Sequence, residues 1–391
     1  MIILSSLLVF IAVSYALLIG LLLLGFSSLE EAPGKQTAQD PGQDNSELQS
    51  GDAQGGLLQI SVVIAFRNEE KNLPGLLRSL ENQSYPDSHF EVIFVDDHSD
   101  DQSARIVSDA CKRHKRYKLL MLGPESYGKK AARAMGAGHA NAEILIQTDA
   151  DVIPGEGFVE SHARMHMSSG ADLIAGPVTI EFQRKTFLNI LDTLDMLSLT
   201  GTGAGSYFYD NPVMCSGANL SYKATLLEEA QLDREGDSRS PSGDDMFLLI
   251  AAKKLGKKIR YIKSARVLVH THPSGSVSAF IRQRIRWGSK AKHYTDPDIL
   301  WLGIQVSITN LILLLSCFLP IFNAGFLPVV LVCLVLKSAA DFGLLIAVSR
   351  FTGQASLMWY FPLVSALYYV YLPILAFASV LGSVRWKGRK Y

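Results

Sequence analysis

The sequence predicts an α/β domain with a mostly parallel sheet, flanked by transmembrane helices. Between residues 57 and 298, short apolar runs alternate with amphipathic helical patterns, as is typical of strands and helices around a parallel sheet. Long uncharged apolar runs lie near both ends, and 48% of the 391 residues are hydrophobic, which is more than one soluble domain usually carries. We therefore expect residues 57–298 to form an α/β domain attached to a membrane.

The N-terminal apolar run is expected to be a membrane anchor. Residues 2–26 carry no charge and are long enough to cross the roughly 30 Å of bilayer hydrocarbon as a helix. The run lacks the basic start and small-residue cleavage site of a signal peptide, so we expect an uncleaved anchor over residues 1–27. Residues 28–56 are rich in Gly, Pro, Gln and Asp, which predicts a flexible linker.

The C-terminal region, residues 299–384, contains three further candidate spans, at roughly 302–322, 326–348 and 357–382. Lys337 and Asp341 are four residues apart within the second candidate, which predicts an ion pair buried between helices, with a structural role favoured over transport.

The last residues, 385–391, form a basic tail that should prefer the cytoplasm. Three full spans after a cytoplasmic domain would instead leave this tail outside. Either one C-terminal segment is re-entrant or interfacial, or the positive-inside rule fails for this chain.

Charge and cysteine content favour neither nucleic-acid binding nor a cysteine framework. The formal net charge is +0, which gives no sign of a nucleic-acid partner. The cysteines are scattered, at Cys111, Cys215, Cys317 and Cys333, so neither a disulfide framework nor a CxxC metal site is indicated.

Acidic residues follow three successive predicted strands. The strand "LLQISVVIAF" leads into "RNEE", the strand "FEVIFVDD" ends in Asp96 and Asp97, and the strand "EILIQTDAD" ends in Asp149 and Asp151. The carboxyl ends of parallel strands meet at one edge of a sheet, where ligands collect. Since unpaired carboxylates would repel one another there, we expect a shared cation and a polar ligand.

The pair Asp149 and Asp151 is a candidate site for Mg²⁺ or Mn²⁺, because such ions are held by one or two carboxylates together with substrate phosphates. For a D-x-D alone, a solvated turn is the alternative. In "GKKAARAMG", Lys129, Lys130 and Arg133 either face the same anion or form a solvated basic face. Asp96 or Asp97 is expected deeper at the sheet edge, where a carboxylate can accept the N–H of a uracil-type base.

Seven segments occur in an order that resembles family 2 glycosyltransferases of the GT-A fold: "VVIAFRNEEKNLPGLLRSLENQSY", "VDDHSDD", "GKKAARAMGAG", "TDAD", "SGANLSYKA", "GDDMFLLIAAKKLG" and "QRIRW". The chain looks like a membrane-bound member. The resemblance implies inverting transfer from a nucleotide-activated sugar, expected to be UDP-linked, with a divalent metal on the D-x-D. The donor-binding residues that it implies are Ala65, Arg67, Glu69, Asp96, Asp97, Lys129, Lys130, Arg133 and Asp149.

The segment "GDDMF" places Asp245 where the family keeps its catalytic base, with Asp244 beside it as a second candidate catalytic residue. A carboxylate there can take the proton of an acceptor hydroxyl. The alternative is that both residues only favour a helix N-terminus.

The segment "QRIRW" places Gln283, Arg286 and Trp287 on one helix face, where we expect contacts with the leaving diphosphate and the acceptor. Taken alone, such a helix is more often interfacial packing.

Two segments depart from the family pattern. Where many relatives have an acidic residue, this chain has His270 and His272, which are either structural or include one further metal ligand. Residues 193–208, "TLDMLSLTGTGAGSYF", contain G-x-G spacing but follow a helical pattern, which excludes a dinucleotide-binding loop. We interpret them as a flexible segment near the acceptor entrance.

The sequence therefore predicts a multi-pass enzyme of a bacterial cell membrane, with its α/β domain facing the cytoplasm and a lipid or membrane-associated glycan as acceptor. A processive polysaccharide synthase of the same family is the nearest alternative. A haloacid-dehalogenase-type phosphatase shares the D-x-D strand but leaves "VDDHSDD" and "QRIRW" unexplained. A transporter or scaffold built around Lys337 and Asp341 explains none of the acidic strand ends.

Overall fold

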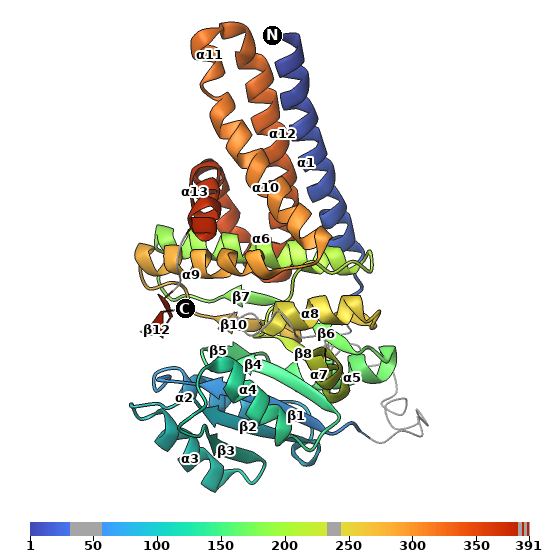
Figure 1. The fold of residues 1–391 in the computed structure, drawn as a ribbon, viewed down its shortest axis with the longest axis vertical. Coiled ribbons are helices and arrows are strands. Elements are labelled where there is room, and N and C mark those ends of the chain that lie inside the picture. The colour runs from blue at the N-terminus through green and yellow to red at the C-terminus, as the bar shows by residue number, and fades with distance from the viewer. Residues whose placement is uncertain (32–56, 233–243, 382–384, 387–388, 391) are drawn as a thin grey trace, which may run out of the picture.

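The computed structural model describes residues 1–31, 57–232, 244–381, 385–386 and 389–390. The predicted linker lies outside these ranges from residue 32 onwards, as does part of the predicted basic tail. Figure 1 shows an α/β domain at one end of the molecule and a bundle of long helices at the other.

The α/β domain is built on a seven-stranded sheet in the order β3-β2-β1-β4-β8-β6-β9. The first four strands of this order run parallel, whereas β8 is antiparallel to both of its neighbours. The strands are β1 (Ile60–Phe66), β2 (Phe90–Asp96), β3 (Tyr117–Met121), β4 (Ile144–Asp149), β6 (Leu173–Ala175), β8 (Leu220–Lys223) and β9 (Ile259–Tyr261). Continuous apolar runs such as "ISVVIAF" form fully buried strands because helices cover both sheet faces.

Helices around the sheet are α2 (Leu73–Glu81), α3 (Ser103–Arg113), α4 (Lys129–Gly138), α5 (Phe158–Ser169), α7 (Ala224–Leu232) and α8 (Asp244–Lys254). A small sheet in the order β5-β10-β7 lies between the main sheet and the helical bundle (Figure 1). Its strands are β5 (Val152–Pro154), β10 (Val269–Thr271) and β7 (Val178–Ile180).

The register of the parallel strands aligns their carboxyl ends. Ala65 of β1 lies opposite Asp149 of β4, and Phe66 lies opposite Asp96 of β2. The acidic residues that follow these strands therefore reach one edge of the sheet, as the sequence predicts.

Four stretches of the described chain are helical, long and apolar enough to cross a membrane: Ile2–Ser28, Pro297–Phe322, Ala324–Phe351 and Ala355–Ser379. They contain α1 (Ile2–Ser28), α10 (Pro297–Ser316), α11 (Leu319–Phe322), α12 (Leu327–Phe351), the short helix η6 (Ala355–Tyr360) and most of α13 (Phe361–Leu381). This agrees with the four apolar segments predicted from the sequence.

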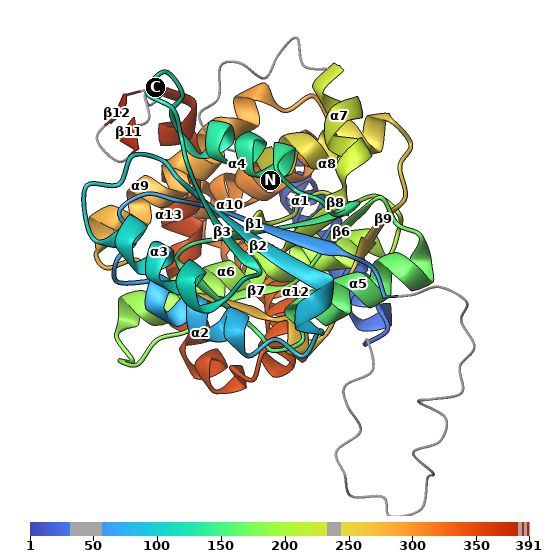
Figure 2. The same cartoon turned by 90° about the horizontal axis from the view of Figure 1, so that it is seen from below.

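The last of these helices, α13, lies across the others. Figure 1 looks nearly along its axis, whereas Figure 2 shows its length, and α1, α10 and α12 run along the long axis of the molecule. The strands that follow it, β11 (Arg385–Trp386) and β12 (Arg389–Lys390), lie beside the α/β domain in Figure 1. An interfacial C-terminal segment was one of the two possibilities that the basic tail left open.

Two helices, α6 (Phe187–Tyr207) and α9 (Val277–Ser289), lie across the base of the bundle (Figure 1). The expectation of a flexible segment at residues 193–208 is wrong, because nearly all of it belongs to the buried helix α6. A Cβ on Gly205 would lie 2.2 Å from the backbone oxygen of Leu22, so glycine lets α1 pack directly on α6. Close packing of glycines, and not a loop, explains the "GTGAG" run.

Hydrogen bonds between buried charged and polar side chains join α6 and α9 to α13. The guanidinium group of Arg284 on α9 donates to Asp192 and Asp195 of α6, over 2.7 Å in each case. The hydroxyl of Tyr371 on α13 donates to the other oxygen of Asp195 over 2.9 Å. One ionic cluster therefore joins α6, α9 and α13.

The predicted pair of Lys337 and Asp341 forms inside the bundle, with 2.7 Å between Nζ and Oδ2. Lys337 is fully buried. Tyr15 of α1 donates its hydroxyl to Asp341 over 2.8 Å, so the pair fastens α1 to α12. This supports the structural role.

Two buried histidines predict an acid-sensitive α/β domain. Burial lowers the pKa of His162 to about 3 and that of His166 to about 4, and both rings contact the hydroxyl of Ser221. Each folded-state pKa lies below the unfolded value of about 6.5. The contribution of each histidine to the free energy of unfolding is therefore fully present above pH 6.5 and is lost as the pH falls towards 4. The expected loss at pH 5 is on the order of 2 kcal/mol for each histidine.

Chemical unfolding of the purified chain between pH 7.5 and about 5, where few carboxylates titrate, measures this loss. The exposed-histidine variant His139→Gln should keep the wild-type pH dependence. An unfolding midpoint that stays constant over this range would contradict the prediction.

Candidate active site

A cavity of about 1110 Å³ runs from the carboxyl ends of β1 and β4, past α9, to the space between α10 and α13. Most of the predicted site residues line it: Ala65, Arg67, Glu69, Asp97, Lys129, Arg133, Asp149, Asp151, Asp245, Gln283, Arg286 and Trp287. The fold thus brings together residues that are up to 222 positions apart, from Ala65 to Trp287.

Five predicted residues do not line this cavity: Asp96, Lys130, Asp244, His270 and His272. Asp96 is fully buried behind the wall, where both of its oxygens accept from the backbone N–H of Ser99. Asp97, and not Asp96, is therefore the member of this pair that lines the cavity. His270 lies on β10 and faces Glu181, with 3.8 Å between Nδ1 and Oε2, and neither His270 nor His272 lines the cavity with Asp149 and Asp151.

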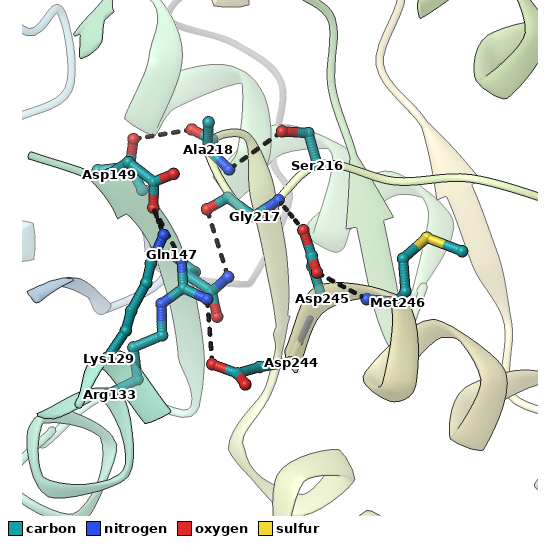
Figure 3. A network of polar contacts seen from close by, with 11 residues as sticks. Lys129, Arg133, Gln147, Asp149, Ser216, Gly217, Ala218, Asp244, Asp245 and Met246 are labelled. Carbon is teal, nitrogen blue, oxygen red and sulfur yellow. Dashed lines mark hydrogen bonds and ion pairs between the residues drawn. The ribbon is translucent and has the colours of Figure 1, made fainter. Parts of the chain in front are cut away.

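The carboxylate of Asp149 is neutralised by two cations of α4 (Figure 3). Its Oδ1 lies 2.6 Å from Nζ of Lys129 and 2.8 Å from Nη2 of Arg133. Arg133 also reaches Asp244, with 3.3 Å between Nη1 and Oδ2. Burial alone would raise the pKa of Asp149, but Lys129 and Arg133 hold it well below its usual range. Two of the basic residues predicted to face a diphosphate are therefore engaged by Asp149 in this structure.

The other member of the D-x-D, Asp151, is exposed to the cavity. The surrounding protein and the neighbouring charge of Asp149 raise its pKa. A cation placed between the two carboxylates would remove this repulsion. The described residues contain no group of three or more His, Cys, Asp or Glu side chains arranged to hold a metal. The pair does fit an ion such as Mg²⁺ that takes its remaining ligands from substrate phosphate and water.

The carboxylate of Asp245 is held by backbone donors at the start of α8. Gly217 donates its N–H to Oδ2 over 2.9 Å, and Met246 donates to Oδ1 over 2.9 Å (Figure 3). Burial would raise the pKa of Asp245, but Lys290, Arg133 and these N–H groups together lower it. Asp245 is therefore an oriented, ionised carboxylate on the cavity wall.

Side chains of the site pack closely around Gly217. A Cβ there would lie 2.5 Å from Nε2 of Gln147 and 3.3 Å from Oδ2 of Asp245. The segment "SGANL" thus lets the backbone pass close enough to donate to the carboxylate.

One face of α9 continues the cavity wall from the carboxylates towards the membrane helices. It carries the predicted Gln283, Arg286 and Trp287, and the ring of Trp287 lies 4.7 Å from the guanidinium of Arg284. Lys290 also lines the cavity, although no sequence motif contains it. Helical spacing would have found it, because residue 290 follows Gln283 by seven positions and Arg286 by four. Burial lowers the pKa of both Arg286 and Lys290, and both cations face Asp245.

Comparison with known proteins identifies the domain. Residues 61–230 match the model of "Glycosyl transferase family 2". The chain is 25% identical over 240 residues to "Probable glycosyltransferase YdaM" of Bacillus subtilis (strain 168), covering 59% of this chain and 54% of the relative. It is 33% identical over 95 residues to "Undecaprenyl-phosphate 4-deoxy-4-formamido-L-arabinose transferase" of Proteus mirabilis (strain HI4320), covering 24% of this chain and 29% of the relative.

Among solved structures, the fold resembles "Mannosyltransferase PcManGT from Pyrobaculum calidifontis in complex with GDP-Man and Mn2+", with a TM-score of 0.54 and 18% identity over 96% of this chain and 99% of that one. The matches to the two curated relatives span about half of one and less than a third of the other. The predicted fold, a mostly parallel α/β domain of GT-A type with helices long and apolar enough to cross a membrane, is confirmed. The phosphatase alternative is wrong, and the chain carries a glycosyltransferase domain of family 2.

Proposed function

We propose that this chain is a membrane-bound inverting glycosyltransferase that moves a sugar from a nucleotide-sugar donor to a lipid or membrane-associated glycan. The observation that carries the proposal is the single cavity, in which charged residues at the sheet edge adjoin apolar residues of α10 and α13. The charged part fits a nucleoside diphosphate, and the apolar part fits an acceptor from the bilayer. We expect the donor to be UDP-linked.

In this proposal Asp245 is the general base. Its carboxylate takes the proton of the acceptor hydroxyl while the acceptor oxygen bonds to the anomeric carbon, and the nucleoside diphosphate leaves from the opposite face. A single displacement of this kind inverts the anomeric configuration. Arg286 faces Asp149 and Asp151 across the cavity, where it would stabilise the leaving diphosphate.

Asp149 and Asp151 would hold a divalent metal, Mg²⁺ or Mn²⁺, which neutralises diphosphate charge when bound. Lys129 and Arg133 keep Asp149 ionised before any cation arrives. The mannosyltransferase with a similar fold was solved with GDP-mannose and Mn²⁺, in keeping with this assignment.

We further propose that α1, α10 and α12 cross the membrane and that α13 lies at its surface. The α/β domain and the basic tail then lie on the same side, and the positive-inside rule places both in the cytoplasm. Such an arrangement removes the conflict between the tail and three full C-terminal spans.

Purified chain incubated with labelled UDP-glucose, UDP-N-acetylglucosamine and GDP-mannose tests the proposed activity. We expect release of nucleoside diphosphate from at least one donor, and its loss in EDTA with recovery on adding Mn²⁺. Absence of turnover in membranes of native lipid composition would refute the proposal. Polymeric product of increasing length would favour the processive synthase instead.

The cavity-lining face of α9 gives a prediction that separates effects on acceptor use from effects on donor use. Trp287→Ala should reduce transfer to the membrane acceptor more than hydrolysis of the donor by water, because the ring lines the cavity that joins Asp245 to α10 and α13. Arg286→Ala should reduce both activities, since both release diphosphate.

The matched control for these two variants is Trp301→Ala, which removes an exposed tryptophan outside the cavity lining. Measuring transfer and hydrolysis side by side in each variant shows whether Trp287 serves the acceptor or the donor. Equal losses of both activities in Trp287→Ala would place the acceptor elsewhere.

A further inference from the structure

The membrane end of the cavity opens sideways between α10 and α13. An apolar stripe of α10 runs from Trp301 to Leu315, and every member is more than 40% exposed: Trp301, Ile304, Ile308, Leu311 and Leu315. The two ends of the stripe do not line the cavity, so the stripe faces the outside, whereas its three middle members do line it. Phe377 of α13 also lines the cavity and is 68% exposed. These side chains thus belong both to the cavity wall and to the apolar outer surface.

Polarity changes along the cavity from this opening to the sheet edge. Between α10 and α13 the wall is mostly hydrocarbon, including Leu302, Leu372 and Leu375. Next to α9 and at the start of α8, it carries Lys290 and Asp245. A molecule with a long apolar part at the opening and a polar group at Asp245 matches these two ends, and this is the chemistry of a membrane lipid.

The base at the polar end selects between two kinds of lipid head group. Asp245 is ionised and held by two backbone N–H donors, so both of its oxygens can only accept. A neutral hydroxyl can donate to it and needs a base to react. A phosphate head is already an anion and needs no base to react, so Asp245 would have no proton to take from it.

Building on the proposed function, we propose that the acceptor is a membrane lipid that enters between α10 and α13 and presents a neutral hydroxyl to Asp245. The hydroxyl oxygen bonds to the anomeric carbon, the bond from that carbon to the diphosphate breaks, and the proton passes to Asp245. The product is an O-linked glycolipid, and the hydrocarbon stays between α10 and α13 throughout.

The variant Ile308→Trp tests the route, because it narrows the opening at the middle of the stripe. Its matched control is Leu315→Trp, on the same face of α10 but outside the cavity lining. The full chain is placed in nanodiscs of lipid extracted from native cells, with the labelled donor that the wild type consumes. The ratio of lipid-linked label to free labelled sugar should fall at least tenfold in Ile308→Trp and stay within twofold of wild type in Leu315→Trp.

Equal ratios in Ile308→Trp and Leu315→Trp would overturn the entry route. If Ile308→Trp does not fold, Ile304→Trp provides the same obstruction one turn away. Wild-type protein that consumes no donor refutes the proposed function, whereas donor hydrolysis without lipid-linked label refutes only the lipid acceptor.

The bond in the labelled lipid tests the head group. A sugar attached to a hydroxyl stays on the lipid in mild acid, whereas a sugar attached through phosphate is released. We expect the label to stay with the lipid. Release of the sugar by mild acid would show a phosphate acceptor and overturn the assignment of a hydroxyl.

Discussion

Asp245→Asn is expected to leave donor affinity near the wild-type value and to lower turnover by about 10²–10⁴, the usual effect of losing general-base assistance. The side chain keeps its shape, and its amide oxygen can still accept the N–H of Gly217 or Met246. What is lost is the ability to take a proton from the acceptor. Calorimetric titration with UDP and a turnover assay, performed on the same preparation, measure both quantities.

The neighbouring variant Asp244→Asn is the matched control for this experiment. Asp244 lies outside the cavity lining and contacts Arg133, so its loss should affect turnover less. A larger loss of turnover in Asp244→Asn than in Asp245→Asn would reverse the two assignments. Collapse of donor binding in Asp245→Asn would move that residue to the donor site.

Asp151→Asn is expected to abolish the stimulation of UDP binding by Mn²⁺ while the domain stays folded. Asp151 is exposed to the cavity and its pKa is raised by the surrounding protein and by Asp149, so removing its charge relieves repulsion and costs little stability. Calorimetry with UDP, in the presence of Mn²⁺ or EDTA, measures the effect. Metal-stimulated binding that survives in Asp151→Asn would remove the carboxylate pair from the metal site.

Asp149→Asn should lose the same stimulation and also destabilise the domain. Its carboxylate is the partner of Lys129 and of the buried Arg133, and removing one partner of a buried pair is costly. The sequence left Lys129 and Arg133 either facing a bound anion or solvated, whereas in the structure both contact Asp149. Asp210→Asn, at an exposed position outside the cavity lining, should change neither binding nor stability. Equal unfolding midpoints in Asp149→Asn and Asp151→Asn would contradict the predicted difference in stability between these two variants.

The sequence by itself determined the parts of this protein that depend on local pattern. Buried strands are recognisable because apolar runs such as "ISVVIAF" must be covered on both faces, and the residues that follow them then share one edge of the sheet. The order of strands and helices therefore sufficed to bring Arg67, Asp97 and Asp149 into one site. Apolar composition likewise sufficed to find the long helices.

Only the tertiary structure decided which side chains face the cavity and in which direction each long helix runs. Asp96 and Asp97 are adjacent in sequence, yet Ser99 holds one behind the wall while the other lines the cavity. Apolar composition does not distinguish α13, which lies across the bundle, from the upright α12, because the direction of α13 depends on distant partners such as Asp195. The glycines interpreted as a flexible segment belong to a packed helix, since the backbone of α1 that fills the space above Gly205, at Leu22, is 183 residues away in the chain. Pairings across such distances leave no periodic signal in the sequence, so the proposed acceptor opening between α10 and α13 had to come from the fold.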